Sequence, residues 1–151
     1  MKALLQRVTS ASVKIDENIV GSIGAGIVVL LGVAGDDSEK DADYLVDKIV
    51  NLRIFNDAQN KFNLSALQIN GEMLVISQFT LLSDTRRGRR PSFTQAAEPA
   101  KAEALYNYFV MKMKHMGLKV ETGRFAAHML VEIHNDGPVT IMLDSREKLL
   151  P

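Results

Sequence analysis

In the first third of the chain, some segments alternate apolar and polar residues and others are short apolar runs. Both patterns predict β-strands. The expected strands cover residues 3–8, 12–15, 18–23 and 27–33. The last of these is apolar on both faces, which is typical of a central strand covered on both sides. We therefore expect a sheet whose first strands are joined by short turns.

The spacing of apolar residues changes to that of a helix in two places. In the first, Ser38 stands at the capping position with Asp41 three residues later, which predicts a helix over residues 38–52. The second helix is expected to begin at Pro99, because proline suits a first helical turn, and to end at Gly117. Its stripe of methionine, aromatic and aliphatic residues is expected to pack in the core: Ala102, Leu105, Tyr106, Phe109, Met113 and Met116.

The rest of the chain completes a mixed α/β fold. Residues 56–70 are predicted to be rich in turns, and residues 144–151 to form a frayed tail. Further strands are expected at residues 73–79, 118–121, 129–133 and 139–143. About eight strands and two main helices fit a double-layered, barrel-like sheet with the helices on one side. Parallel pairing is expected only where a helix lies between two strands.

Length and composition exclude several classes of protein. The chain has 151 residues, which fits a single domain over residues 1–151. It contains no cysteine, so disulfides, thiolate metal sites and cysteine nucleophiles are excluded. The N-terminus lacks the apolar run of a signal peptide, and no segment approaches the roughly 18–20 apolar residues that cross a bilayer. We therefore expect a cytoplasmic protein that does not interact with a membrane.

The three histidines do not indicate a metal site. They are His115, His128 and His134, and their separations match no ligand motif. No Ser-His-Asp pattern stands out, although catalytic triads are spatial and sequence spacing does not exclude one. If the chain is an enzyme, we expect it to lack a strong general base and to need no metal or other cofactor.

The end of the strand predicted over residues 73–79 is the segment that best suits a functional rather than a purely structural role. It finishes in Ser77, Gln78, Phe79 and Thr80, three polar side chains around one aromatic ring. Strand ends that lead into loops are a usual place for active sites. The alternative is that these hydroxyl groups are simply compatible with a strand.

Charge is unevenly distributed, although 18 basic and 18 acidic residues cancel over the whole chain. An acidic stretch over residues 36–47 is balanced by a cluster of arginines that follows the strand end: Arg86, Arg87, Arg89 and Arg90. Guanidinium groups suit phosphate oxygens, and Phe93 follows closely enough to offer a stacking face for a base. The cluster predicts a phosphate-rich partner, with a solvated loop as the alternative.

Residues 135–140 form a second unusual segment, Asn-Asp-Gly-Pro-Val-Thr. This composition is a strong turn signal that requires no function. The bond between Gly137 and Pro138 can also be cis, which would hold the neighbouring carbonyl groups in a rigid frame.

Taken together, these segments resemble the bacterial D-aminoacyl-tRNA deacylases over nearly the whole chain. The resemblance rests on several separated stretches, namely 5–8 (LQRV), 11–13 (ASV), 53–55 (RIF), 77–81 (SQFTL), 90–93 (RPSF), 122–125 (TGRF) and 135–140 (NDGPVT). Departures from the family pattern begin only at Asp144.

The resemblance implies a carboxylic ester hydrolase that cleaves the ester between a D-amino acid and the terminal adenosine of tRNA, as chiral proofreading in translation. It implies a homodimer with its sites at the subunit interface. It also implies that Gly137–Pro138 is cis and reaches into the partner's site, opposite Ser77, Gln78, Phe79 and Thr80. The arginine cluster would then hold phosphates of the acceptor stem.

Such a motif could select a D-amino acid through its carbonyl groups and its bulk. A rigid Gly-Pro turn can accept hydrogen bonds from the α-ammonium group while its bulk fills the space that an L side chain needs. Glycine has no side chain to reject, so we expect cleavage of glycyl-tRNA as well.

Two mechanisms remain open at this point. Either the Thr80 hydroxyl is the nucleophile, or backbone amides near Phe79 and Thr80 stabilise an oxyanion while the ribose 2′-hydroxyl assists water. The absence of a base from the motifs favours the second. The alternative functions are a non-catalytic RNA-binding module that uses the arginine loop and Phe93, and a structural dimer without a ligand.

Overall fold

The structure is a computed structural model, and it describes residues 1–148. Within this range the strands are β1 (Lys2–Ile15), β2 (Asn18–Ile23), β3 (Gly26–Gly32), β4 (Phe55–Asn56), β5 (Phe62–Leu64), β6 (Glu72–Ser77), β7 (Val120–Thr122) and β8 (Leu130–Asp144). The helices are α1 (Glu39–Asn51), α2 (Ala66–Ile69) and α3 (Pro99–His115), with 3-10 turns η1 (Phe79–Leu82) and η2 (Ser145–Glu147). The mixed α/β class is therefore confirmed.

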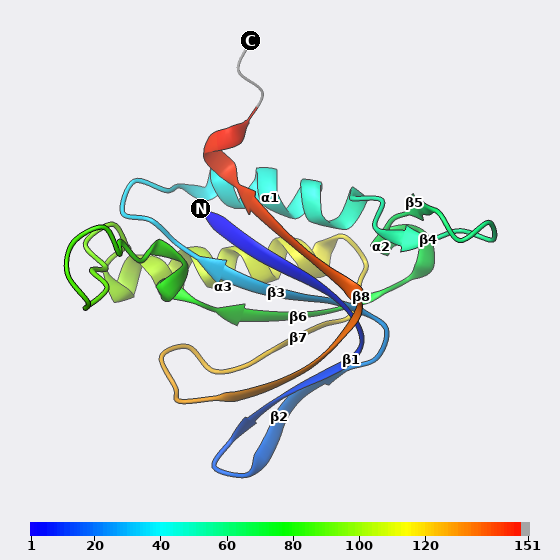
Figure 1. Ribbon diagram of the computed structural model, residues 1–151, viewed down its shortest axis with the longest axis horizontal. Helices are drawn as coiled ribbons and strands as arrows, with labels where there is room; N and C mark the ends of the chain where they lie inside the picture. The colour runs from blue at the N-terminus through cyan, green and yellow to red at the C-terminus, as the bar shows by residue number, and fades with distance from the viewer. Residues whose placement is uncertain (149–151) are drawn as a thin grey trace.

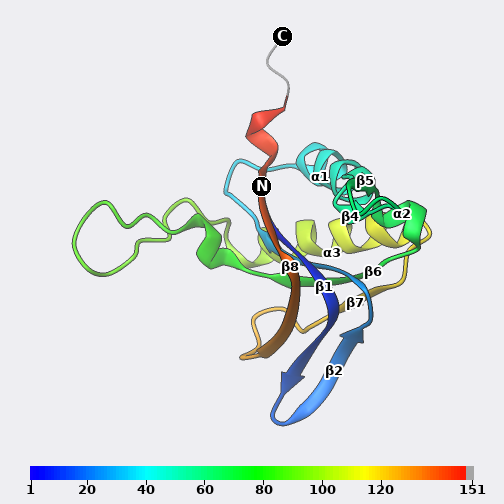
Figure 2. The same cartoon turned by 45° about the vertical axis from the view of Figure 1, so that its right-hand side comes forward.

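The main sheet is built around the long strand β1. The strand order is β2-β1-β3-β6-β7, and β8 pairs with the other edge of β1. The strands β3, β6 and β7 pair in parallel, and helices lie between them in the chain, as predicted. At Gly21 in β2, an added Cβ would lie 2.7 Å from the carbonyl oxygen of Thr122 in β7. The two end strands thus approach each other, and the sheet is nearly closed into a barrel (Figures 1 and 2).

The helices α1 and α3 cover one side of the sheet (Figure 1). Helix α1 has the expected capping box between Ser38 and Asp41, because a serine oxygen and a carboxylate can satisfy the free N–H groups of the first turn. Its apolar face is buried, namely Ala42, Leu45, Val46, Ile49 and Val50. In α3, Leu105, Phe109 and Met113 are buried as expected. Met116, which the predicted stripe included, lies beyond the end of α3 and is 37% exposed.

Three predicted boundaries are wrong. The segments 3–8 and 12–15 form one strand, β1, because β8 pairs along its whole length. The segments 129–133 and 139–143 likewise join into β8, whose middle bulges out of the ladder. The turn-rich segment 56–70 contains the short β4–β5 hairpin and α2. The two long strands depend on pairing between distant segments, whereas α2 begins at a local capping box of Ser65 and Gln68 that the prediction missed.

The prediction of a frayed tail from residue 144 is wrong for residues 144–148. Ser145 is buried, and its hydroxyl accepts a hydrogen bond of 2.8 Å from the amino group of Met1. The same amino group donates to the Asp37 carboxylate at 2.5 Å. A buried ion pair and a continuing strand therefore hold this end of the chain, while residues 149–151 lie outside the described residues. Helices between residues 1 and 148 are all too short or too polar to cross a membrane.

Candidate active site

The segment Ser77 to Thr80 lies where β6 leaves the sheet and turns into η1. The N–H of Gln78 donates to the carbonyl of Leu31 in β3 at 2.7 Å, which fixes the start of the turn. At Gly32 an added Cβ would lie 2.5 Å from the Leu82 side chain, so η1 packs tightly against β3. These contacts give the strand end a defined position.

Two backbone donors at this turn are unused. Within residues 1–148, the N–H groups of Phe79 and Thr80 donate to no other group of the chain, whereas the N–H of Leu81 bonds to the carbonyl of Gln78. The Thr80 hydroxyl accepts a hydrogen bond from the side-chain amide of Gln78. An amide cannot take a proton from a hydroxyl at neutral pH, so this contact does not activate Thr80 as a nucleophile.

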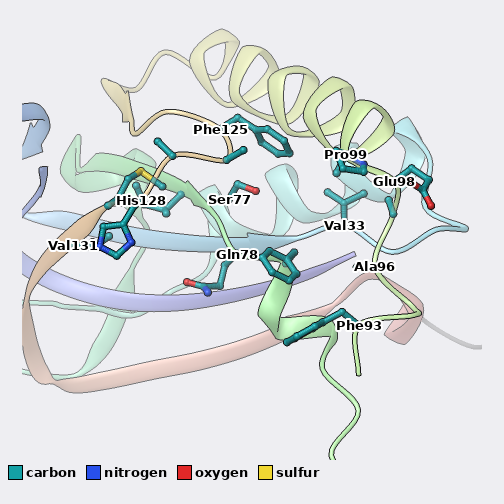
Figure 3. Close-up of a pocket in the computed structure, with 17 residues that line it drawn as sticks. Val33, Ser77, Gln78, Phe93, Ala96, Glu98, Pro99, Phe125, His128 and Val131 are labelled. Atoms are coloured by element: carbon teal, nitrogen blue, oxygen red, sulfur yellow. The ribbon is translucent and has the colours of Figure 1, made fainter. Parts of the chain in front are cut away.

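A mostly apolar cavity of about 640 Å³ lies beside the strand end (Figure 3). Ser77, Gln78 and Phe79 line it together with residues from the start of α3 and from the segment between β7 and β8. The remaining lining residues are Val33, Ile76, Phe93, Ala96, Ala97, Glu98, Pro99, Ala102, Phe125, Ala126, Ala127, His128, Met129 and Val131. A concave apolar site with a few polar groups is the usual form of a small-ligand pocket.

Aromatic rings line this cavity in two places. Phe79 and Phe93 meet edge to face, with ring centroids 5.0 Å apart. Phe125 lies on the side of α3 (Figure 3), and its ring centroid is 6.1 Å from that of Tyr106. Burial raises the pKa of Tyr106 to about 12, so its hydroxyl remains protonated and donates to the carbonyl of Val75 at 2.7 Å. This bond ties α3 to β6 behind the cavity.

Three of the lining residues with aromatic or ionisable side chains had no predicted role. Phe125 and His128 belong to the segment between β7 and β8, and Glu98 precedes α3. Phe125 lies in one of the stretches that carry the family resemblance, which was the available signal for it. His128 and Glu98 carried no such signal, because only the packing of this segment and of α3 brings them to the cavity.

The arginine cluster lies on a loop that projects from the body of the molecule (Figure 2). Two backbone hydrogen bonds between Asp84 and Ser92, of 2.7 and 2.9 Å, close the base of the loop. Arg86 folds back on Asp84, with contacts of 2.9 and 2.7 Å, and these hydrogen bonds lower the pKa of the Asp84 carboxyl to about 2. Arg87, Arg89 and Arg90 are exposed and form no ion pair in the described part of the chain. The four arginines are therefore not equivalent.

The Gly137–Pro138 segment is not brought to the cavity of its own chain. It lies in a bulge of β8, where residues 136–139 face the single residue Arg7 of β1. The Gly137–Pro138 bond is cis, and Gly137 has a φ of 127°. The side-chain amide of Asn135 closes the base of the bulge by donating to the carbonyls of Arg7 and Val139, at 3.0 and 2.9 Å. Asp136, Gly137 and Pro138 are exposed.

The guanidinium of Arg7 holds this bulge in place through hydrogen bonds, a role that the sequence did not reveal. Its Nε donates to the carbonyl of Asp136 at 3.1 Å, and its Nη1 donates to the carbonyl of Ile54 at 2.8 Å and to Oδ1 of Asn56 at 3.2 Å. Arg7 is only 6% exposed, and the ring of Phe62 lies 5.3 Å from its guanidinium carbon. A buried, multiply bonded guanidinium makes the bulge rigid.

Comparison with known proteins identifies the family. The model for D-Tyr-tRNA(Tyr) deacylase matches residues 4–144. The chain belongs to this deacylase family. A D-aminoacyl-tRNA deacylase from Dehalococcoides mccartyi is 58% identical over 100% of this chain and 99% of its own length. One from Caldicellulosiruptor saccharolyticus is 60% identical over 97% of this chain and 99% of its own. The predicted enzyme class, a D-aminoacyl-tRNA deacylase, is thus confirmed at the level of the family.

Two solved structures resemble this chain closely in fold. The c-Myc DNA unwinding element binding protein superposes with a TM-score of 0.90 at 41% identity, and the match covers 95% of this chain and 98% of that chain. A probable eukaryotic D-amino acid tRNA deacylase gives a TM-score of 0.84 at 17% identity over 94% of this chain, which shows the shared fold.

Proposed function

We propose that the protein hydrolyses the ester of D-aminoacyl-tRNA and releases the D-amino acid and free tRNA, as a proofreading step in the cytoplasm. The observation that carries this proposal is the pair of unused N–H groups at Phe79 and Thr80 beside an apolar cavity, in a chain of the deacylase family. Two adjacent free backbone donors suit the oxyanion of an acyl-transfer reaction. The part of the cavity that Phe125 lines has the chemistry to hold the terminal adenosine.

The reaction then needs little from the side chains of this protein. Water attacks the ester carbonyl carbon, and the developing oxyanion accepts hydrogen bonds from the N–H groups of Phe79 and Thr80. The ribose 2′-hydroxyl of the substrate assists by relaying a proton from the water to the departing 3′-oxygen. The tRNA leaves with a free 3′-hydroxyl, and the amino acid leaves as its carboxylate after its carboxyl group loses a proton to the solvent.

Selection against L-amino acids is assigned to a second copy of the chain in a homodimer. Gly137 and Pro138 are exposed, held firmly by Arg7, and absent from the lining of their own cavity, as far as residues 1–148 define it. Such a bulge is suited to enter the cavity of a partner copy. Its carbonyls would receive the α-ammonium group, and its backbone would exclude an L side chain, because steric exclusion by rigid backbone discriminates better than attraction.

Hydrolysis of three charged tRNAs tests this function. We expect the protein to release D-tyrosine from D-tyrosyl-tRNA, to release glycine from glycyl-tRNA at high enzyme concentration, and to leave L-tyrosyl-tRNA intact. Equal release from both tyrosyl enantiomers, or none, would contradict the proposal. Binding of uncharged tRNA without any ester cleavage would instead favour the RNA-binding module.

Replacing Thr80 by alanine distinguishes the two mechanisms. We expect the variant to keep kcat for D-tyrosyl-tRNA within about tenfold of the wild type, because the backbone N–H remains and Gln78 offers the hydroxyl no base. Loss of a true nucleophile costs roughly 10⁴-fold or more. A loss of that size, or an acyl-enzyme detected by mass spectrometry in the wild type, would establish Thr80 as the nucleophile.

We assign the acceptor-stem phosphates to the arginine loop, with the main part taken by Arg87, Arg89 and Arg90. Alanine at both Arg87 and Arg89 is expected to weaken binding of uncharged tRNA and to make the dependence on salt shallower, by about 0.7–0.9 in the log–log slope for each phosphate that the loop no longer neutralises. Arg86→Ala is the matched control, because Asp84 already neutralises that guanidinium. Unchanged slopes in the double variant would remove the loop from tRNA binding.

A further inference from the structure

The two rings that meet at the edge of the cavity, Phe79 and Phe93, have no part in the proposed chemistry. Phe79 is 55% exposed, although phenylalanine is normally buried. Phe93 contacts it edge to face, with the ring planes at 71°. A large exposed aromatic that is held in place by a second ring is typical of a surface that stacks on a ligand.

The position of this pair relative to the arginine loop is set by the chain itself. Phe79 begins η1, which leads into the loop, and Phe93 directly follows Ser92, whose backbone closes the loop against Asp84. The pair therefore stands where the loop joins the body of the molecule. Figure 3 shows Phe93 on the side of the cavity from which this loop departs.

A nucleic-acid strand whose ester lies in the cavity and whose phosphates reach the arginine loop must pass the rings of Phe79 and Phe93. The ester would lie at the free N–H groups of Phe79 and Thr80, and the stem phosphates at the arginines. Phe79 and Phe93 line the cavity next to the base of the arginine loop. A strand that runs from the ester to these arginines therefore leaves the cavity past the two rings.

We propose that Phe79 and Phe93 form a stacking platform for the nucleotide that precedes the terminal adenosine, the second cytidine of the CCA end. This inference rests on the proposed function and adds a subsite to it. Single-stranded RNA ends are recognised by aromatic faces on which splayed bases stack, and such stacking tolerates any base. The platform reads the single-stranded end rather than the identity of the tRNA.

Phe93 is the residue to change, because the backbone of Phe79 belongs to the catalytic machinery. Phe93→Leu keeps an apolar side chain at the base of the loop and removes the aromatic face, and Phe93→Tyr keeps that face as a matched control. Three esters serve as substrates: D-tyrosyl-adenosine, the D-tyrosyl ester of the CCA trinucleotide, and D-tyrosyl-tRNA. Thermal unfolding of both variants monitors their integrity.

The expected result is a loss that depends on substrate length. Phe93→Leu should lower kcat/KM roughly tenfold to a hundredfold for the CCA ester and for the tRNA, which is the usual contribution of one stacked base, and should leave D-tyrosyl-adenosine unchanged. Phe93→Tyr should resemble the wild type on all three. An equal loss on D-tyrosyl-adenosine would place the ring against the amino acid or adenosine and overturn the proposal, as would no loss on any substrate. A wild-type protein that cleaves none of the three esters would refute the deacylase function itself.

Discussion

Replacing Gly137 by alanine is expected to lower kcat/KM for D-tyrosyl-tRNA by about 100-fold, the usual cost of misplacing a positioning group by about 1 Å. The φ of 127° at Gly137 is one that L side chains rarely adopt. An added Cβ would also lie 2.8 Å from Cγ2 of Val139 and 3.1 Å from Nη2 of Arg7. Because Arg7 is buried and bonded in several directions, the bulge rather than Arg7 is expected to shift.

The measurement is steady-state hydrolysis of D- and L-tyrosyl-tRNA by the variant. Gly35→Ala is a matched control, since an added Cβ there would have no neighbour within 4 Å, and it should keep wild-type rates. Thermal unfolding of Gly137→Ala measures the stability lost to the strained φ, and the rates are compared at a temperature where the variant is folded. Wild-type kcat/KM in this variant would show that the bulge does not contribute to the site.

Arg7→Lys is expected to reduce both stability and activity, although it preserves the charge. A lysine ammonium cannot reproduce the planar fork that reaches Asp136, Ile54 and Asn56 at once. Breaking such a buried charged network costs about 3 kcal/mol in the free energy of unfolding. The bulge then loses its support, so kcat/KM for D-tyrosyl-tRNA should fall at least about tenfold even at temperatures where the variant is fully folded.

Urea unfolding and hydrolysis assays measure the two effects separately. Arg53→Lys provides the control, because Arg53 is exposed and should tolerate the exchange. A variant with normal activity but reduced stability would show that Arg7 supports the fold without positioning Gly137 and Pro138. Unchanged stability would contradict the role given to the buried guanidinium.

Much of the fold follows from local patterns. The capping box of Ser38 and Asp41, the apolar face of α1 and the start of α3 at Pro99 are all decided within a few residues of sequence. The breaks predicted within β1 and β8 are absent because these two strands pair with each other along their length. That pairing joins residues more than 100 positions apart, which no local pattern can indicate.

The candidate site likewise contains residues that the sequence indicated and one, Arg7, that it did not. Ser77, Gln78, Phe79 and Thr80 stand out as a polar strand end, and Gly137 and Pro138 as a turn signal. Arg7 does not stand out, because an arginine in an alternating strand is usually an exposed residue. In β1 it shares the buried face with Ala3 and Leu5, and the bulge in β8 supplies the Asp136 carbonyl that its guanidinium binds.

The sequence by itself determined the kinds of element, the exclusion of thiol chemistry and the segments most suited to a nucleic-acid ester. The tertiary structure decided which of these groups act together. It holds the Thr80 hydroxyl with an amide, neutralises Arg86 with Asp84 and places Gly137 and Pro138 outside their own cavity. The reason is physical: propensity and periodicity act over a few residues, whereas burial and hydrogen-bond partners depend on packing between distant segments.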